Sequence, residues 1–129
     1  MNTRFQHHYT REEARQLLPQ VEEWLVRLEA SKKELERSVP RVESLLEGGA
    51  DLGGGLVVRY LSAYLEFKGG LAEFSRREIL IKDLDRGLVD FPAFMAGREV
   101  FLCWERGEPD IEHWHDLDTG FAGRAPIEE

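Results

Sequence analysis

The sequence lacks the features that would place a protein outside the cell or in a membrane. It contains 1 cysteine in 129 residues, so no disulfide can form within the chain. Residues 1–9 are polar and have none of the apolar core of a secretory signal. The longest unbroken apolar run, 100–104, is far shorter than the roughly 18 residues that a membrane-spanning helix needs. We therefore expect a cytoplasmic protein with no membrane association.

Positive charge is also scarce. The chain has 17 Lys and Arg residues against 25 Asp and Glu residues, a formal net charge of -8, and no basic tract. Binding to phosphate backbones needs clustered cations, so we expect no nucleic-acid partner. Residues 99–129 hold 9 acidic and 2 basic residues, and this segment therefore carries a net charge of -7. The acidity belongs to the C-terminal part of the chain, where we expect any functional site.

The N-terminal half has the pattern of a long helix. Thr10 and Glu13 have the spacing of a capping box, in which each side chain accepts the backbone N–H of the other residue. Apolar residues then recur alternately every four and three positions from Ala14 to Leu46, with Lys32 as an exception in the series. This heptad pattern predicts a helix that packs against neighbours along one side.

Prolines and glycines predict interruptions of this helix. Pro19 and Pro40 each lack an N–H, so we expect a kink or a restart near both positions. Segment 48–55 has five glycines in eight residues, which ends the helix, and helical spacing resumes over residues 56–77. Two such helices predict an antiparallel hairpin of roughly 40 to 55 Å, at 1.5 Å per residue.

The hairpin carries more aromatic side chains than it can cover by itself. Trp24, Tyr60, Phe67 and Phe74 all lie on or beside the apolar series of the two helices. A lone pair of helices cannot bury all four rings, so we expect a homodimer with a four-helix core.

Alternating patterns follow the hairpin. Segments 79–81 and 87–91 predict two strands around a turn, with Pro92 ending the second strand, and segments 100–105 and 111–115 predict a second pair around 106–110. The pattern D-L-D-x-G occurs at 83–87 and 116–120 and indicates two similar turns closed by a glycine with positive φ.

The predicted fold is therefore α+β, a long antiparallel helical hairpin followed by a small antiparallel β-sheet. We expect a single domain over residues 1–129. Residues 10–78 form its hairpin, and residues 79–129 form a β-cap that ends in a C-terminal loop.

Two histidines mark the β-cap as a candidate metal site. His113 and His115 are two residues apart on a predicted strand, so both rings point to one face. If the connector 106–110 sets the register, Cys103 lies opposite His113 and Phe101 opposite His115, with Glu105 nearby. A thiol and two imidazoles on one face could hold zinc or iron. The alternative is a pair of solvated histidines that contact the many local carboxylates.

Neighbouring residues have simpler interpretations as well. Cys103 precedes Trp104 and has no basic residue next to it in the sequence. A thiol buried in the core is therefore the alternative to a reactive thiol. Arg124 is expected to neutralise Asp116 or Asp118.

Several segments together resemble a known family. Residues 9–14, 17–19, 82–92 and 97–104, and the C-terminal segment 114–124, resemble domain-of-unknown-function family 2203, a small prokaryotic family. The resemblance implies no activity, substrate or cofactor. His113 is not among the residues that match the family's signature, which favours His115 with two aspartates as the ligand set. The matching positions form a candidate pocket: Cys103, Trp104, His115, Asp116, Asp118 and Arg124.

Two functions are compatible with these patterns. The first is a homodimeric helical-hairpin interaction module whose acidic β-cap faces a basic protein partner or a cation. The second is a divalent-metal-binding protein, with a metal-dependent hydrolase as one form, that uses His113, His115, Asp116 and Asp118 as ligands.

Overall fold

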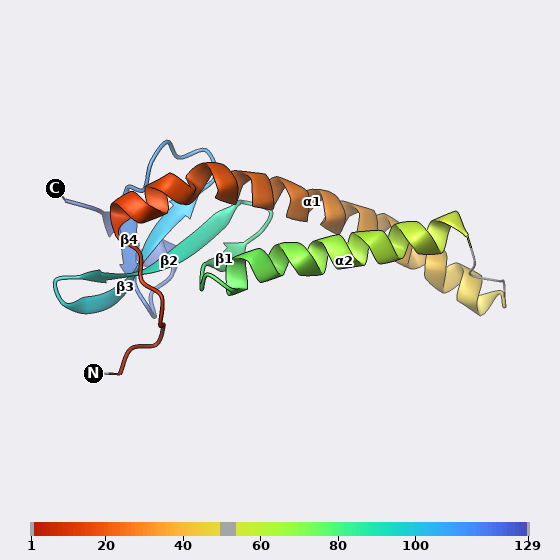
Figure 1. The fold of residues 1–129 in the computed structure, drawn as a ribbon, viewed down its shortest axis with the longest axis horizontal. Coiled ribbons are helices and arrows are strands. Elements are labelled where there is room, and N and C mark those ends of the chain that lie inside the picture. Colours follow the sequence, from red (N-terminus) through yellow and green to blue (C-terminus); the bar gives the residue numbers. More distant parts are fainter. Residues whose placement is uncertain (1, 50–53, 129) are drawn as a thin grey trace.

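Two helices and a five-stranded sheet make up the computed structural model, which describes residues 2–49 and 54–128. The hairpin extends away from the sheet, which lies at one end of the molecule (Figure 1). The order of helices before strands confirms the predicted α+β fold. The elements are α1 (Arg11–Glu47), α2 (Gly55–Ser75), β1 (Leu80–Asp83), β2 (Leu88–Met95), β3 (Arg98–Glu105), β4 (His113–Asp116), the 3-10 helix η1 (Phe121–Gly123) and β5 (Ala125–Pro126).

Helix α1 begins at the predicted capping box. The Glu13 N–H donates to Thr10 Oγ1 at 3.0 Å, and the Thr10 N–H donates to Glu13 Oε1 at 2.9 Å. The helix then continues through Pro19 and Pro40, so the restart expected at these prolines does not occur. Both prolines are exposed, so neither ring displaces a side chain of the core. The hydrogen bonds of the neighbouring turns keep the helix continuous.

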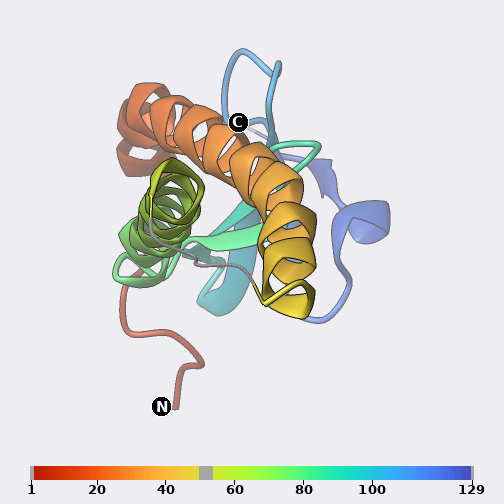
Figure 2. The same ribbon diagram turned by 90° about the vertical axis from the view of Figure 1, so that its right-hand side faces the viewer.

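Helices α1 and α2 lie side by side and run antiparallel (Figures 1 and 2). Part of the predicted glycine loop, residues 50–53, lies outside the described residues. A Cβ added to Gly70 of α2 would lie 2.7 Å from Leu28 Cδ2 of α1, so this glycine permits the close approach of the two helices. Among residues 2–49 and 54–128, no helix combines enough length and apolar character to cross a lipid bilayer.

The strands form a meander in the order β1-β2-β3-β4-β5, with every neighbouring pair antiparallel. Strand β2 continues through Pro92 to Met95, so the predicted end of this strand at Pro92 is wrong. The pairing of β1 with β2 stops at Asp90, and Pro92 therefore lies where no N–H is needed for β1. The Pro92 carbonyl accepts instead from the Tyr9 N–H at 2.7 Å.

The register of β3 and β4 is the predicted one. Cys103 lies opposite His113, and Phe101 lies opposite His115. Both D-L-D-x-G segments form turns that include a glycine with positive φ, 68° at Gly87 and 71° at Gly120. The local geometry of the sheet was therefore readable from turns and spacing.

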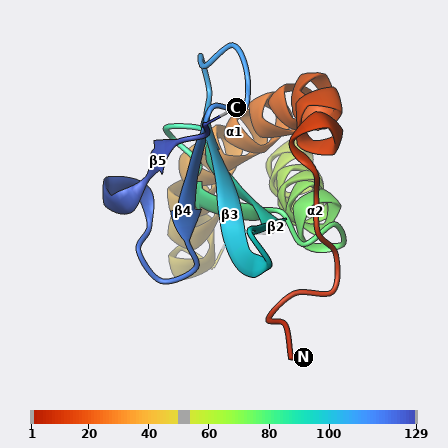
Figure 3. The same cartoon turned by 90° about the vertical axis from the view of Figure 1, so that its left-hand side faces the viewer.

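The two faces of the sheet have different neighbours. On one face the apolar side chains of β2 and β3 form a core with α1; this core includes Val21, Leu25, Val89, Phe91, Val100, Leu102 and Trp104. The opposite face carries the polar side chains of the strands. Figure 3 shows this end of the molecule, with η1 and β5 beyond β4 on one side and the N-terminal segment passing on the other.

Candidate functional site

Three chemically active side chains meet on the face of the sheet that does not contact α1. Asp90 comes from β2, Cys103 from β3 and His115 from β4, and Asp90 lies directly opposite Cys103 in the register. One ligand atom from each residue lies within 4.8 Å of those of the other two. The residues are 1%, 1% and 2% exposed, respectively. We call this group the buried triad.

The hydrogen bonds of His115 determine where its ring proton lies. Its Nδ1 is 2.7 Å from the carbonyl oxygen of Asp116. A carbonyl can only accept, so Nδ1 carries a proton and donates it. The other ring nitrogen, Nε2, is 3.0 Å from Asp90 Oδ2 and shares one further proton with this carboxyl group. The His115 ring is thereby fixed with Nε2 directed into the triad.

Asp90 keeps one oxygen without a partner. Its Oδ1 is buried and makes no hydrogen bond among the described residues. Burial raises the pKa of the Asp90 carboxyl group, while the neighbouring His115 acts in the opposite direction. An unsatisfied carboxylate oxygen in a protein interior is destabilising, because it has lost water and gained no donor.

Cys103 lies between this carboxyl group and a cation. Burial raises the pKa of its thiol to about 12, and the charge of Asp90 adds to the effect. Arg124 lies within hydrogen-bonding reach of the thiol and acts in the opposite direction. The Arg124 guanidinium also donates to Glu108, with N–O distances of 3.1 and 3.0 Å to the two carboxylate oxygens.

Aromatic residues from both ends of the chain cover this face. Phe5 of the N-terminal segment contacts Phe101 edge-on, with ring centroids 5.4 Å apart, and Phe101 lies 5.4 Å from the ring of His115. The ring of Phe121 in η1 has guanidinium carbon atoms of Arg86 and Arg124 each 4.3 Å from its centroid. The buried triad is therefore enclosed and not open to a substrate.

The structure brings together part of the candidate pocket predicted from sequence. Cys103, His115 and Arg124 meet there. Trp104 is on the opposite face, where it packs in the core and its Nε1–H donates to the Glu108 carbonyl at 3.0 Å. His113 has its Nδ1 3.3 Å from Glu108 Oε2, but without the geometry of a hydrogen bond.

The remaining predicted ligands scatter into ion pairs. Asp116 contacts Arg98 at 3.2 Å, and Asp118, whose side chain is 85% exposed, contacts Arg4 at 3.1 Å. Both carboxylates lie in and beside the turn after β4, on the solvent side. The expected ligand set of His113, His115, Asp116 and Asp118 therefore does not converge on one point.

Two expected ion pairs have different partners in the structure. Arg124 was expected to neutralise Asp116 or Asp118, and it binds Glu108 instead. Glu105 was expected near the histidines, and it accepts hydrogen bonds from Arg86 at 2.9 and 3.1 Å.

Sequence reasoning missed Asp90. This residue lies in the predicted strand 87–91, between the apolar residues Val89 and Phe91, and a lone aspartate in such a strand is a signal in itself. Its partners were missed because the pairing of β2 with β3 depends on the extension of β2 past Pro92. A charge in a buried strand needs a partner on the next strand, and this argument could have led to Cys103.

The acidic C-terminal segment is largely neutralised within the chain. Six of its carboxylates contact an Arg or His side chain from the N-terminal segment, α1, the sheet or a connecting segment. The pairs are Glu99 with His8, Glu105 with Arg86, Glu108 with Arg124, Asp110 with Arg15, Asp116 with Arg98 and Asp118 with Arg4. The net charge of -7 of residues 99–129 is thus not a continuous acidic surface.

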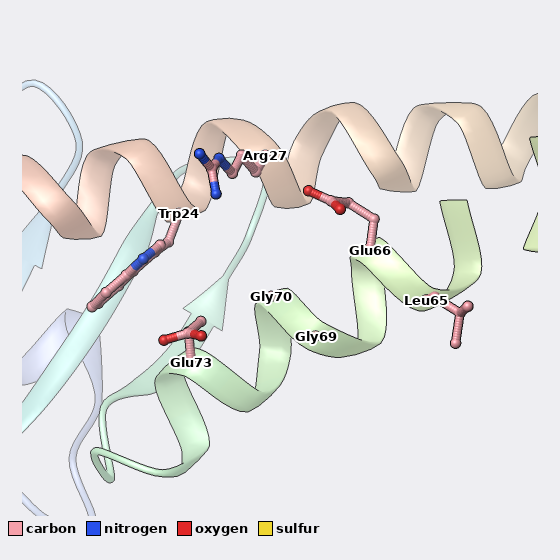
Figure 4. Close-up of a pocket in the computed structure, with 7 residues that line it drawn as sticks. All are labelled: Trp24, Arg27, Leu65, Glu66, Gly69, Gly70 and Glu73. Carbon is pink, nitrogen blue, oxygen red and sulfur yellow. The ribbon is translucent and has the colours of Figure 1, made fainter. Parts of the chain in front are cut away.

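A second candidate site lies on the hairpin. Helix α2 has two buried residues, Ala63 and Phe74, and several large apolar side chains that face solvent. We call these exposed residues the outer face of α2: Val58 (61% exposed), Leu61 (49%), Tyr64 (44%), Leu65 (65%) and Leu71 (40%). Figure 4 shows Leu65 directed away from α1, while Glu66 extends from α2 toward α1 and Arg27 lies along α1.

The four aromatic residues on which the expected homodimer was based are covered to different degrees. Phe74 is 2% exposed and contacts Trp24 edge-on at 5.6 Å, while Trp24 and Phe67 pack partly buried against the core. Tyr60 is also partly buried. The most exposed apolar side chains of α2 are other residues, those of its outer face, and they are mainly aliphatic.

Comparison with known proteins gives a family and no further relative. Residues 7–127 match the family described as "Uncharacterized conserved protein (DUF2203)", which covers nearly the whole chain, and the protein belongs to this family. The resemblance found in the sequence is thus confirmed. Comparisons with curated proteins and with solved structures give no significant match.

Proposed function

We propose that this member of domain-of-unknown-function family 2203 is an interaction module that works as a homodimer, in which the outer faces of α2 from two copies pack against each other. The observation that carries the proposal is the apolar character of both sides of α2. One side packs on α1 through Ala63, Gly70 and Phe74. The other side exposes large aliphatic residues, and a helix with apolar residues on two sides normally packs against a neighbour on each.

The spacing of the exposed residues supports a helix partner. Val58, Leu61 and Leu65 follow each other at three and four positions and form one line along α2. From Val58 to Leu71 this line is about 20 Å long, at 1.5 Å per residue. Contiguous apolar surface of this kind on a soluble chain marks a site of protein association.

The charges on α2 favour a second copy over a partner of strong charge. The helix carries Arg59 and Lys68 as cations and Glu66 and Glu73 as anions, so its net charge is zero. Two identical helices can therefore approach without repulsion, and neither a basic nor an acidic partner is specifically attracted. A two-fold axis would place the same patch on both copies, which gives a closed four-helix arrangement.

The sheet end gives less support for partner binding. Most carboxylates of the acidic segment are paired within the chain, and the buried triad is covered by aromatic side chains. The proposal therefore assigns association to the hairpin and leaves the sheet as the base that holds the two helices in place.

Size-exclusion chromatography with light scattering of the full chain tests the proposal. We expect the mass of a dimer at micromolar concentration. The variant Leu65→Glu should run as a monomer with unchanged helical circular dichroism, because a charge at the centre of the outer face is incompatible with burial.

The matched control is Val26→Glu on α1. Val26 is 50% exposed, like the residues of the outer face, but it lies on the other helix. We expect this variant to remain a dimer. A wild-type chain that runs as a monomer at high micromolar concentration contradicts the proposal, as does a dimer that Leu65→Glu leaves intact.

A further inference from the structure

We propose that the buried triad of Asp90, Cys103 and His115 is a zinc site that stabilises the sheet. The three residues come from three consecutive strands and place one carboxylate oxygen, one sulfur and one imidazole nitrogen within 4.8 Å of one another. A metal ion at this point would connect β2, β3 and β4 through their side chains. This inference is independent of the proposed dimer, which uses the opposite end of the molecule.

The donor set selects the metal. Thiolate and imidazole are ligands that zinc prefers, and a single carboxylate is compatible with them. Magnesium and calcium take oxygen donors almost exclusively, so a site with one sulfur and one nitrogen does not suit them. The triad supplies three of the four ligands of tetrahedral zinc, and a water molecule can supply the fourth.

The orientation of His115 is that of a metal ligand. Zinc-binding histidines usually donate their second ring N–H to a backbone carbonyl or a carboxylate, which fixes the ring and its tautomer. His115 does this through Nδ1, 2.7 Å from the Asp116 carbonyl oxygen, and directs Nε2 toward Asp90 and Cys103.

The unpartnered oxygen of Asp90 gives independent support. Asp90 is 1% exposed, and its Oδ1 makes no hydrogen bond among the described residues. The neighbouring Cys103 thiol is only a weak hydrogen-bond donor to this carboxyl group, and a divalent cation would satisfy the oxygen more fully.

The charges of the site balance with zinc present. Binding of Zn²⁺ displaces the proton of the Cys103 thiol and the proton shared by Asp90 and His115, so two positive charges enter as two protons leave. Arg124 does not upset this balance, because its charge is paired with Glu108 at 3.0 Å. Its position beside Cys103 allows an N–H to donate to the thiolate sulfur, as outer-shell groups do in metal sites.

Cobalt(II) is a suitable probe, since it replaces zinc and reports its ligands by absorption. Protein purified without a histidine tag would be unfolded in urea with a chelator, exchanged into metal-free urea and refolded with Co²⁺, because the enclosed triad is accessible in the unfolded chain. We expect one Co²⁺ per chain and a thiolate-to-cobalt charge-transfer band in the near ultraviolet. Cys103 is the 1 cysteine of the sequence, so this band assigns the metal to Cys103 without any variant.

Variants then separate the triad from the ligands expected from sequence. Cys103→Ser should abolish the band, and Asp90→Asn should weaken cobalt binding at least about tenfold, because loss of an outer-shell partner already costs about 10- to 100-fold in metal affinity. The controls Asp116→Asn and Asp118→Asn should leave both stoichiometry and spectrum unchanged. With zinc in 100-fold excess over its dissociation constant, the folding equilibrium constant should rise about 100-fold, seen as a higher Tm.

Several results would overturn the inference. The first is refolded wild-type protein that takes up no Co²⁺, or takes it up without a charge-transfer band. The second is a band and stoichiometry that depend on Asp116 or Asp118. Failure of Cys103→Ser or Asp90→Asn to fold leaves the inference open to refutation, because the absence of the band from wild-type protein overturns it by itself.

Discussion

The two ends of this molecule treat apolar side chains in opposite ways. At the sheet end, α1 buries Ala14, Leu18, Val21, Leu25 and Leu28 in one core with residues of the sheet and of α2. In the half of α1 beyond residue 31, Ser38 is the one buried residue, and Leu46 is 58% exposed. The same heptad pattern runs through both halves, so the difference comes from the presence of a sheet behind the first half and its absence behind the second.

This comparison shows what the hairpin lacks. A third layer closes the core at one end, whereas at the other end two helices share a narrow contact and leave the outer face of α2 uncovered. The sheet end carries the buried triad, and the far end carries the surface proposed for association. The following predictions test this division.

The largest expected effect is on thiol labelling. Cys103 is 1% exposed at the sheet end, so a thiol reagent reaches it only when the structure opens. The variant Arg37→Cys places a second thiol on the outer half of α1, where the Arg37 side chain is 68% exposed. We expect the new thiol to react at least about 1000-fold faster than Cys103, since opening of a core costs several kcal/mol. Comparable labelling rates, followed spectrophotometrically, would show that the sheet end opens readily.

Truncation of apolar side chains should separate the two ends next. Phe74 lies at the junction of α2 with the sheet and is 2% exposed, so Phe74→Ala should lower the free energy of unfolding by about 3 to 5 kcal/mol. Leu46→Ala, at the far end of α1, should change it by no more than about 0.5 kcal/mol. Urea denaturation at one protein concentration measures both. Equal losses would mean that the far end is as well packed as the base.

Adjacent glycines in α2 give a finer test of helix packing. A Cβ at Gly70 would lie 2.7 Å from the fully buried Leu28, while a Cβ at Gly69 would meet nothing within 4 Å. Gly70→Ala should destabilise the protein by about 1 kcal/mol, because overpacking outweighs the gain in helix propensity. Gly69→Ala should stabilise it by about 0.5 to 1 kcal/mol. Urea denaturation measures the change in the free energy of unfolding for both variants, and we expect changes of opposite sign. Changes of the same sign would mean that the close contact between the helices is not at Gly70.

The smallest expected effect is the response to acid. A hydrogen bond from Arg15 lowers the pKa of Asp110, which links the loop between β3 and β4 to α1. A carboxyl group whose pKa is lower in the folded state stabilises the protein above its unfolded pKa of 3.8, and the contribution is lost as the pH falls through the folded pKa. The Tm of Asp110→Asn should therefore fall less than that of the wild type below about pH 4.

The control for this prediction is Glu34→Gln, which removes an ion pair with Arg37 on the outer half of α1. No part of the sheet is linked by this pair, so we expect the pH dependence of the Tm to stay close to that of the wild type. If the Tm depends less on pH in Glu34→Gln than in Asp110→Asn, the outer half of α1 and not the sheet end is the acid-sensitive part.

Much of the fold was readable from sequence because it depends on neighbours a few residues apart. The capping box of Thr10 and Glu13, the hairpin and the positive φ of Gly87 and Gly120 all follow from such local rules. Predictions were wrong where a contact between distant residues determines the structure. Strand β2 can continue through Pro92 because its pairing with β1 stops at Asp90, so β1 needs no N–H from Pro92.

The candidate site was only half predictable for the same reason. Cys103 and His115 were found because the short connection between β3 and β4 fixes their register. Asp90 was missed because it joins them from β2, and the hydrogen bond of Asp90 to His115 spans 25 residues. Asp116 and Asp118 were included because they are close to His115 in sequence. Asp116 is the next residue of β4, so its side chain points to the other face of the strand, and the turn after β4 carries Asp118 into solvent.

The sequence by itself determined the two helices, the first four strands, their order, and the membership of the family, since periodicity, caps and turns act over short distances. The segment expected to be a C-terminal loop instead contains η1 and β5. The tertiary structure alone decided which charges pair, which aromatic rings are covered, and which three residues meet in the buried triad. Those outcomes depend on which strand faces which, because burial and electrostatic pairing are set by neighbours in space rather than neighbours in the chain.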